Sequence, residues 1–419
     1  MQRAGHDLAE ARDPALTLTR NVVALFIGVL LWTACHFGVL AALPLYLHEE
    51  RWDARAIGLA LGVAGVAQVG VRLFAGWIVD AFGRRVPLVL ALVVLSGATA
   101  LLLAPAGGAI LANRVLTGVA FSVGTTAFYT LTVEAAPAAR RSEVQGYIAL
   151  GMTLGIGLGP PVAVAVYQGL SRGSAAPPER LATLAGLTAV VALASGACFL
   201  ATVSGFRPLG RAHPYSLRTP FRREAVVPAF LNFCAQVPYT AFSAFLPLWA
   251  IGRGVGNPGL LFVSSQVGAV ASRLLGGRLA DRYGQSAVLV PAMIGAAATL
   301  AATSLVAGFP AFLLLAGAYG ALYAVSVVVL LGLAGEAAPP EGRSAAINTY
   351  GLGSDVAQLL GPWGLGLAAG IWGIRGALVV AGAVPLVGAV VYLVMRKAPG
   401  PASCHFRPGR AAGRAITGS

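Results

Sequence analysis

Charged residues are scarce in this sequence. Asp, Glu, Lys and Arg together make up 11% of the 419 residues, while hydrophobic residues make up 57%. A soluble domain carries roughly 25% charged residues. The apolar runs are long and nearly continuous, and about 20 such residues are enough to cross a bilayer. The shortage of charge therefore excludes a soluble globular protein and predicts an all-α protein that crosses a membrane many times.

Cysteine and histidine are also scarce, and neither is clustered. Cys35, Cys198 and Cys234 fall in apolar segments and Cys404 falls in the C-terminal tail, without paired spacing. The five histidines are scattered. These patterns argue against a disulfide framework and against a metal site. With no nucleophile–base pair and no phosphate-binding loop in view, we expect a protein that is not an enzyme and that binds no cofactor.

Acidic residues are outnumbered by basic ones, which gives a net charge of +14. Such a charge could indicate a nucleic-acid partner, but the basic residues fall mainly in alternate loops. With both termini assigned to the cytoplasm, 19 of the 29 basic residues lie inside, 6 lie outside and 4 lie within the predicted helices. This is the positive-inside pattern of a membrane protein. We expect the cell membrane as location, both termini in the cytoplasm, and no nucleic-acid partner.

The apolar runs predict twelve membrane-spanning helices in two sets of six. They cover residues 21–47, 56–79, 87–105, 109–134, 144–168, 181–205, 225–251, 258–280, 287–306, 311–335, 344–368 and 375–395. The chain then divides into an N-terminal tail (1–20), a first bundle (21–205), a basic linker (206–223), a second bundle (224–396) and a C-terminal tail (397–419). The tails and the linker are expected on the cytoplasmic side.

The two predicted bundles repeat one another. Glu134-Ala-Ala-Pro137 recurs as Glu336-Ala-Ala-Pro339 and Gly159-Pro160 recurs as Gly361-Pro362, both at an offset of 202 residues. A near-constant offset along six helices indicates a duplicated unit, as in transporters built from repeats.

A glycine–aspartate–glycine loop is the most specific repeated feature. Gly76, Asp80 and Gly83 recur with the same spacing as Gly277, Asp281 and Gly284. This pattern resembles the signature loop of the major facilitator superfamily of secondary transporters, which follows the second helix and again the eighth. The resemblance covers the chain apart from its tails. It implies a twelve-helix carrier that works by alternating access.

The resemblance also implies that this loop closes the cytoplasmic side of the carrier. Asp80 is expected near the cytoplasmic end of the eleventh helix, where a helix N-terminus favours a carboxylate. Arg84, with Arg85 beside it, is expected to pair with Glu134. In the second copy Gln285 replaces the first arginine, so we expect a weaker gate there.

The fifth predicted helix carries glycines at intervals of four residues, Gly151, Gly155 and Gly159, followed by Pro160. This resembles the motif that the family associates with drug and metabolite antiporters, which export. The Gly-Gly pair that usually ends the motif is missing. Export is therefore favoured, and a packing seam without directional meaning is the alternative.

Asp355 is the only acidic residue deep within a predicted span. It lies about eleven residues, or roughly 16 Å, from the cytoplasmic end of its helix, near the middle of a hydrocarbon core about 30 Å thick. Gln358 shares its helix face. An intramembrane carboxylate is a functional hypothesis by default, so we expect Asp355 to take up and release the coupling proton. The alternative is a structural hydrogen-bonding role.

The remaining candidate site residues follow from the helices that line the central cavity in the family, which are the first, fourth, seventh and tenth. His36 stands where many proton-coupled antiporters carry an acid; it could titrate or only join two helices. Arg114 could contact substrate or extend to the surface. The other candidates are Asn232, Gln236, Tyr239 and Ser243 in the seventh helix and Tyr319 and Tyr323 in the tenth.

Together these features predict a monomeric transporter for a small organic molecule, with the lipid bilayer and protons as its other partners. The expected activity is efflux of a drug or metabolite in exchange for protons. One alternative is a proton symporter that imports a sugar or an organic acid. Another is a membrane receptor that has the carrier fold but does not transport. The sequence identifies no substrate, because pocket shape rather than fold decides that.

Overall fold

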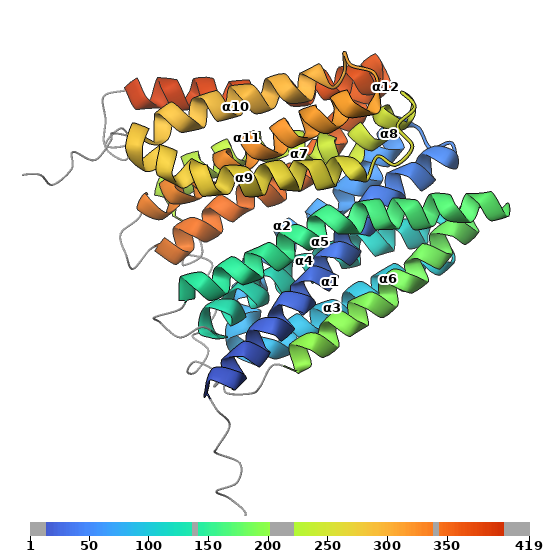
Figure 1. The fold of residues 1–419 in the computed structure, drawn as a ribbon, viewed down its shortest axis with the longest axis horizontal. Helices are drawn as coiled ribbons and strands as arrows, with labels where there is room; N and C mark the ends of the chain where they lie inside the picture. The colour runs from blue at the N-terminus through green and yellow to red at the C-terminus, as the bar shows by residue number, and fades with distance from the viewer. Residues whose placement is uncertain (1–13, 136–140, 202–221, 338–342, 398–419) are drawn as a thin grey trace, which may run out of the picture.

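The computed structural model describes residues 14–135, 141–201, 222–337 and 343–397, in which helices are joined by short turns and loops, with no strand among the described residues. The first half contains α1 (Pro14–Glu49), α2 (Ala54–Phe82), α3 (Arg85–Ala100), α4 (Gly107–Ala135), α5 (Arg141–Gly169) and α6 (Pro177–Leu200). The second contains α7 (Val226–Ala244), α8 (Leu246–Ile251), α9 (Leu260–Tyr283), α10 (Gln285–Ala302), α11 (Phe309–Glu336) and α12 (Arg343–Lys397). Figure 1 shows the halves as two bundles, coloured blue to green and yellow to red.

The helices follow the predicted spans, with three differences that have local causes. The seventh span is divided into α7 and α8 at Phe245, since Pro247 has no N–H to continue the hydrogen-bond ladder. The sixth begins at Pro177 rather than at residue 181, because proline suits the first helical position. The last two spans form α12, which breaks at Gly373, where φ is 71°.

Ten helical runs of the described chain are long and apolar enough to cross a membrane. One of them, Ala346–Arg396, contains the eleventh and twelfth spans. Helix α9 is not among these runs, because several of its residues lie outside the described ones. Its place in the repeat makes it the eighth span, so the layout is the predicted twelve-helix, two-repeat architecture.

The packing inside the halves repeats as well. Helix α1 packs on α5 as α7 packs on α12, and α2 packs on α4 as α9 packs on α11. Between the halves, α2 packs on α12 and α5 packs on α9. These last two contacts form the interfaces that any movement of one half against the other must change.

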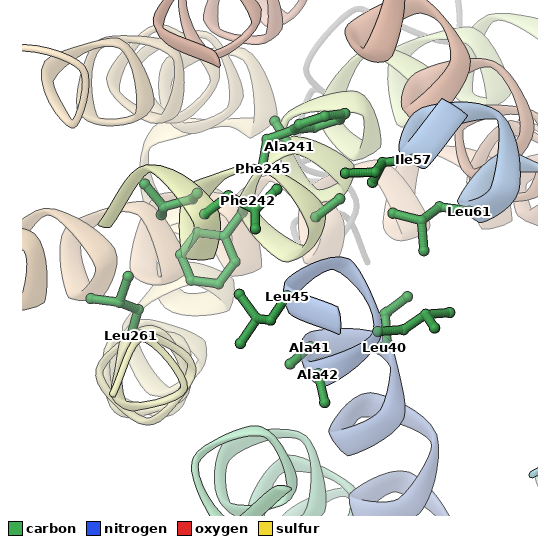
Figure 2. Packing of buried hydrophobic residues seen from close by; sticks show 14 of the residues in the cluster. Leu40, Ala41, Ala42, Leu45, Ile57, Leu61, Ala241, Phe242, Phe245 and Leu261 are labelled. Atoms are coloured by element: carbon green, nitrogen blue, oxygen red, sulfur yellow. The ribbon is translucent and has the colours of Figure 1, made fainter. Parts of the chain in front are cut away.

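The two ends of the molecule differ in how the halves meet. We call the end with the turns at Gly83 and Gly284 the loop end, and the end where α1 stops at Glu49 the closed end. A large hydrophobic core near the closed end draws buried residues from both halves, among them Leu43 of α1 and Phe242 of α7. Figure 2 shows side chains from both halves in this shared core.

Toward the loop end each half has a core of its own. One contains Trp32 and Phe128 of the first half, and the other contains Leu289 and Tyr392 of the second. In Figure 1 the bundles approach one another where α8 and the bend of α12 lie, and they separate toward the opposite side. The halves therefore share apolar packing at the closed end only.

Glycines bring the two halves together at the closed end. A Cβ atom on Gly58 would lie 2.3 Å from the carbonyl oxygen of Pro362, and one on Gly65 would lie 2.3 Å from the amide nitrogen of Leu359. Between α5 and the start of α9, a Cβ on Gly259 would lie 2.4 Å from the Cα of Pro161. By contrast, Gly76 has no such neighbour within 4 Å. The close glycine contacts of the α2–α12 interface thus lie on the closed-end side of the signature loop.

Candidate functional site

The signature loop adopts the same turn in both halves. Gly83 has φ of 78° and Gly284 has φ of 86°, in the region where residues with a Cβ are strained. This geometry explains the last glycine of each motif. The side chains of Asp80, Glu134 and Asp281, and the surroundings of Gly277, lie outside the described residues. The predicted contacts of the latch therefore stay predictions.

The second copy of the loop carries a polar contact at the predicted place. Gln285 Nε2 donates to Glu336 Oε2 at 3.0 Å. These two residues correspond to Arg84 and Glu134 in the first copy. Arg84 itself is buried, and one of its N–H groups donates to the carbonyl of Val79 at 3.5 Å. A neutral amide thus stands where the first copy has a cation.

The glycine motif of α5 packs against α1. A Cβ on Gly155 would lie 2.0 Å from Thr33 Oγ1, and one on Gly159 would lie 2.3 Å from the carbonyl oxygen of Ala34. Gly151 similarly faces the carbonyl of Phe26. The motif is therefore a close packing seam inside the first half, and its predicted link to export stays a prediction.

Asp355 forms an ion pair that joins the two halves. Its Oδ2 accepts a hydrogen bond from Arg72 Nε at 2.6 Å, and its Oδ1 accepts one from Arg72 Nη2 at 2.9 Å. The exposed fraction is 3% for the Asp355 side chain and 17% for Arg72. A two-bonded arginine–carboxylate pair has a specific geometry. Arg72 is a functional candidate that the sequence analysis did not select.

The ion pair lies at the boundary of the α2–α12 interface. Ten residues separate Arg72 from Phe82, which places it about 15 Å from the loop end of α2. The glycines Gly58, Gly62 and Gly65 contact α12 on the closed-end side of the pair. On the other side an added Cβ on Gly76 would meet no atom within 4 Å. Arg72–Asp355 thus lies on the loop-end side of these close glycine contacts.

An equivalent contact joins α9 and α5. Arg273 Nη1 donates to Thr153 Oγ1 at 3.2 Å. Arg273 follows Arg72 by 201 residues, and Asp355 follows Thr153 by 202, so the two contacts are related by the internal repeat. One interface therefore pairs its arginine with a carboxylate, and the other pairs it with a neutral hydroxyl.

The predicted residues of the seventh and tenth spans come together beside Asp355. Asn232 Nδ2 donates to Ser354 Oγ at 2.7 Å, and Gln236 Nε2 donates to the same oxygen at 3.0 Å. The Tyr323 hydroxyl donates to Gln236 Oε1. Ser354, the neighbour of Asp355 in the chain, was not predicted. It joins the amides of α7 to the helix that carries the ion pair.

A stack of aromatic rings lines the same region. Tyr239 stacks on Tyr323 with ring centroids 5.3 Å apart, and Tyr319 lies 5.9 Å from Tyr323 and 5.2 Å from Phe242. Ser243, another predicted residue, donates to the carbonyl of Thr240 in its own helix. Gln358 lies at the α2–α12 interface, where its backbone approaches Gly65.

His36 and Arg114 lie together in the first half. His36 stacks on Phe121 with centroids 4.4 Å apart, and the positive charge of Arg114 acts on it. Arg114 is 4% exposed, which contradicts the alternative that it extends to the membrane surface. His36 Nδ1 and Arg114 Nε have no hydrogen-bond partner among the described residues.

A groove of about 660 Å³ lies between α7 and α12, away from these polar contacts. Its walls are mainly apolar, with Arg222 and Arg223 at one rim; the other lining residues include Val226, Phe230, Phe233, Leu352, Val356 and Leu360. These side chains lie on different faces of the two helices from Asn232 and Ser354. The groove is therefore separate from the polar site.

Comparisons with known proteins agree with this architecture. The model of the Major Facilitator Superfamily matches residues 22–259 and again 228–418. No curated protein sequence gives a match. Three solved structures illustrate the similarity. A POT family transporter in complex with 5-aminolevulinic acid superposes with a TM-score of 0.76 at 12% identity, over 90% of this chain and 96% of that one.

Two further solved structures are transporters that are described with other roles. A bacterial homolog of the human lysosomal transporter Spinster, in an inward-facing and unoccupied conformation, has a TM-score of 0.73 at 14% identity, over 94% of this chain and 98% of that one. The human organic anion transporter MFSD10 (TETRAN) has a TM-score of 0.59 at 17% identity, over 91% of this chain and 100% of that one. At these identities the structures share the fold with this chain.

Proposed function

The chain belongs to the major facilitator superfamily, and on this premise we propose that it exports a small organic molecule in exchange for protons by alternating access. The family model and the transporter folds similar to it indicate a membrane transporter rather than an enzyme. The direction, the coupling to protons and the substrate are our proposal.

The observation that carries the proposal is the Arg72–Asp355 ion pair between α2 and α12. Alternating access requires the closed-end interface to open while the loop end closes. The ion pair joins α2 to α12 across that interface, so it must break or rearrange when the interface opens. When the interface opens, Asp355 and the substrate site therefore change, in the same step, the side of the membrane to which they are exposed.

A proton on Asp355 would weaken this contact between the halves. The ionised carboxylate attracts the guanidinium and accepts two hydrogen bonds from it. Protonation removes the negative charge, and with it most of the electrostatic attraction. In the proposed cycle Asp355 is loaded with a proton from outside when the closed-end interface is open. It releases the proton when the pair forms again.

We assign the loop end to the cytoplasm, because the topology predicted from the sequence gives 19 basic residues to that side and 6 to the other. The structure then corresponds to a carrier whose halves are separated on the cytoplasmic side, the conformation in which an exporter accepts its substrate. The glycine motif of α5 supports export further. A reporter that is active only outside the cell, fused after Ser419, is expected to stay silent.

The test is transport in proteoliposomes under an imposed pH gradient, with a substrate identified by screening. Wild-type protein is expected to concentrate substrate, and Asp355→Asn is expected to lose this while it keeps exchange without a gradient. Asp53→Asn is the matched control, because Asp53 is an exposed N-cap of α2 and asparagine caps equally well. Gradient-driven concentration by Asp355→Asn would refute the coupling role. Binding without any flux in the wild type would favour a receptor.

A further inference from the structure

The central part of the molecule carries more positive than negative charge. Within the described membrane-embedded segments, Arg72, Arg114 and Arg273 are cations at intermediate depth, and Asp355 is the acid among them. We propose that the substrate is an organic anion and that Arg273 binds its negative group. This inference rests on the proposed transport function and specifies its substrate class.

The internal repeat shows why Arg273 is different from Arg72. The residue that corresponds to Asp355 in the first half is Thr153, and Arg273 donates to its hydroxyl at 3.2 Å. A hydroxyl accepts a hydrogen bond but does not neutralise a charge. Arg273 has five N–H donors in a planar arrangement suited to a carboxylate or a phosphate, and one of its nitrogens is used in this contact. The α5–α9 interface thus has the arginine of the repeat, with a threonine at the position of its carboxylate partner.

Accessibility selects Arg273 from the three cations. Arg72 is already paired with Asp355, and Arg114 is 4% exposed. Arg273 is exposed, and it makes no ion pair with any acid among the described residues. In the conformation that is separated at the loop end, it is therefore the cation that an incoming anion can reach.

The surroundings of Arg273 indicate what else the substrate carries. The Tyr129 hydroxyl of α4 donates to Met152 Sδ at 3.6 Å, and Met152 precedes Thr153, which Arg273 contacts. Tyr323 belongs to α11, which packs on α9, the helix of Arg273. Tyr323 belongs to the stack with Tyr239 and Tyr319. These rings offer an apolar and aromatic surface next to the cation. The site is suited to a molecule with one acidic group and a flat apolar body.

A matched set of three ligands tests this inference. The probes are 2-naphthoate, 2-naphthamide and 2-naphthylmethylamine, which share one ring system and differ in charge. Binding to the purified full-length protein is measured by calorimetry. We expect 2-naphthoate to bind at least about tenfold more tightly than the other two, and Arg273→Gln to lose at least about tenfold in affinity for it, in line with hydrogen bonds to charged groups.

Two variants provide controls. Arg282→Gln removes an exposed arginine of the same helix that stacks on Tyr283, outside the cluster, and it is expected to bind 2-naphthoate like the wild type. Thr153→Asp keeps Arg273 but supplies the missing carboxylate, and it is expected to lower the affinity for 2-naphthoate as Arg273→Gln does.

The inference is overturned if 2-naphthoate does not bind, if the amide or the amine binds as well, or if Arg273→Gln and Thr153→Asp bind it unchanged. Proton-driven transport of a neutral or cationic molecule would overturn this inference and leave the proposed function intact. Transport of an organic anion that does not depend on the pH gradient would overturn the proposed proton coupling and leave this inference intact.

Discussion

The two interfaces between the halves are built from equivalent positions but differ at their centres. Gly58 faces Pro362 in the α2–α12 interface, and Gly259 faces Pro161 in the α5–α9 interface. Each interface then reaches an arginine in the loop-end half of its helix. The first arginine meets Asp355 and the second meets Thr153. The shared scaffold holds the halves together, while the diverged partner gives each interface its own chemistry.

The middle contact of each interface also differs between the halves, in which helix supplies the small residue. In the α2–α12 interface the glycine is Gly65 of α2, and it faces Leu359. In the α5–α9 interface the corresponding residues are Gln266 and Gly157, so the glycine lies on the other helix. Close approach needs a small residue on one side only. Both interfaces therefore keep a close approach of the helices, although the residue that permits it lies on different helices.

The largest expected difference between the interfaces is in stability. Arg72→Gln leaves Asp355 as a buried charge without its partner, which costs about 3–5 kcal/mol. Arg273→Gln removes one hydrogen bond from an exposed guanidinium to a neutral hydroxyl and costs about 1 kcal/mol or less. Thermal and denaturant unfolding in detergent measure both values. The double variant Arg72→Gln/Asp355→Asn is expected to recover most of the loss, and equal losses in the two single variants would contradict the comparison.

The glycines of the two interfaces are expected to have a smaller and similar effect. Gly62→Ala would place a Cβ 2.2 Å from the Trp363 ring, and Gly259→Ala would place one 2.4 Å from Pro161. Overpacking of this kind costs about 1–3 kcal/mol, and it should shift the carrier away from the conformation that is packed at the closed end. The measurement is thiol labelling of Ala42→Cys in the shared core, in a background without native cysteines. We expect about tenfold faster labelling.

Gly70→Ala is the matched control for the glycine variants, because no atom lies within 4 Å of its added Cβ. Its labelling rate should equal that of the Ala42→Cys background. Unchanged labelling in both Gly62→Ala and Gly259→Ala would show that the glycines do not hold the closed end together.

The smallest expected effect concerns the loops. Gln285→Arg gives the second half the residue that the first half has at Arg84, opposite the exposed Glu336. An exposed ion pair contributes about 1 kcal/mol or less, so unfolding should shift slightly upward and transport should change less than about twofold. Unfolding and initial transport rates measure these effects. A loss of transport above tenfold would show that the neutral amide is itself required.

The sequence was sufficient for the helices and for the repeat, because these depend on local patterns. The apolar runs located the spans, and the loop motif repeated at an offset of 201 identified α9 as the counterpart of α2. The positive φ values at Gly83 and Gly284 are also local requirements of a turn. By contrast, the break inside α12 at Gly373 was predicted as an ordinary loop between two separate helices.

The pairing of side chains between helices was not predictable in the same way. Arg72 and Asp355 are 283 residues apart, and their contact depends on how α2 packs against α12. Their similar distance from the loop end was available in the sequence and could have suggested the pair. Asp355 was selected, and so were Asn232, Gln236 and Tyr323, but Ser354 and Thr153 look like ordinary helix residues until their neighbours are known.

The threonine at position 153 has an electrical consequence. An exporter that binds an anion at Arg273 and exchanges it for one proton moves the equivalent of two positive charges inward in each cycle. Each charge gains about 2.3 kcal/mol per 100 mV, so a membrane voltage of that size, negative inside, supplies about 4.6 kcal/mol. Such a carrier generates a current, and it continues to export on voltage alone when the pH is equal on the two sides.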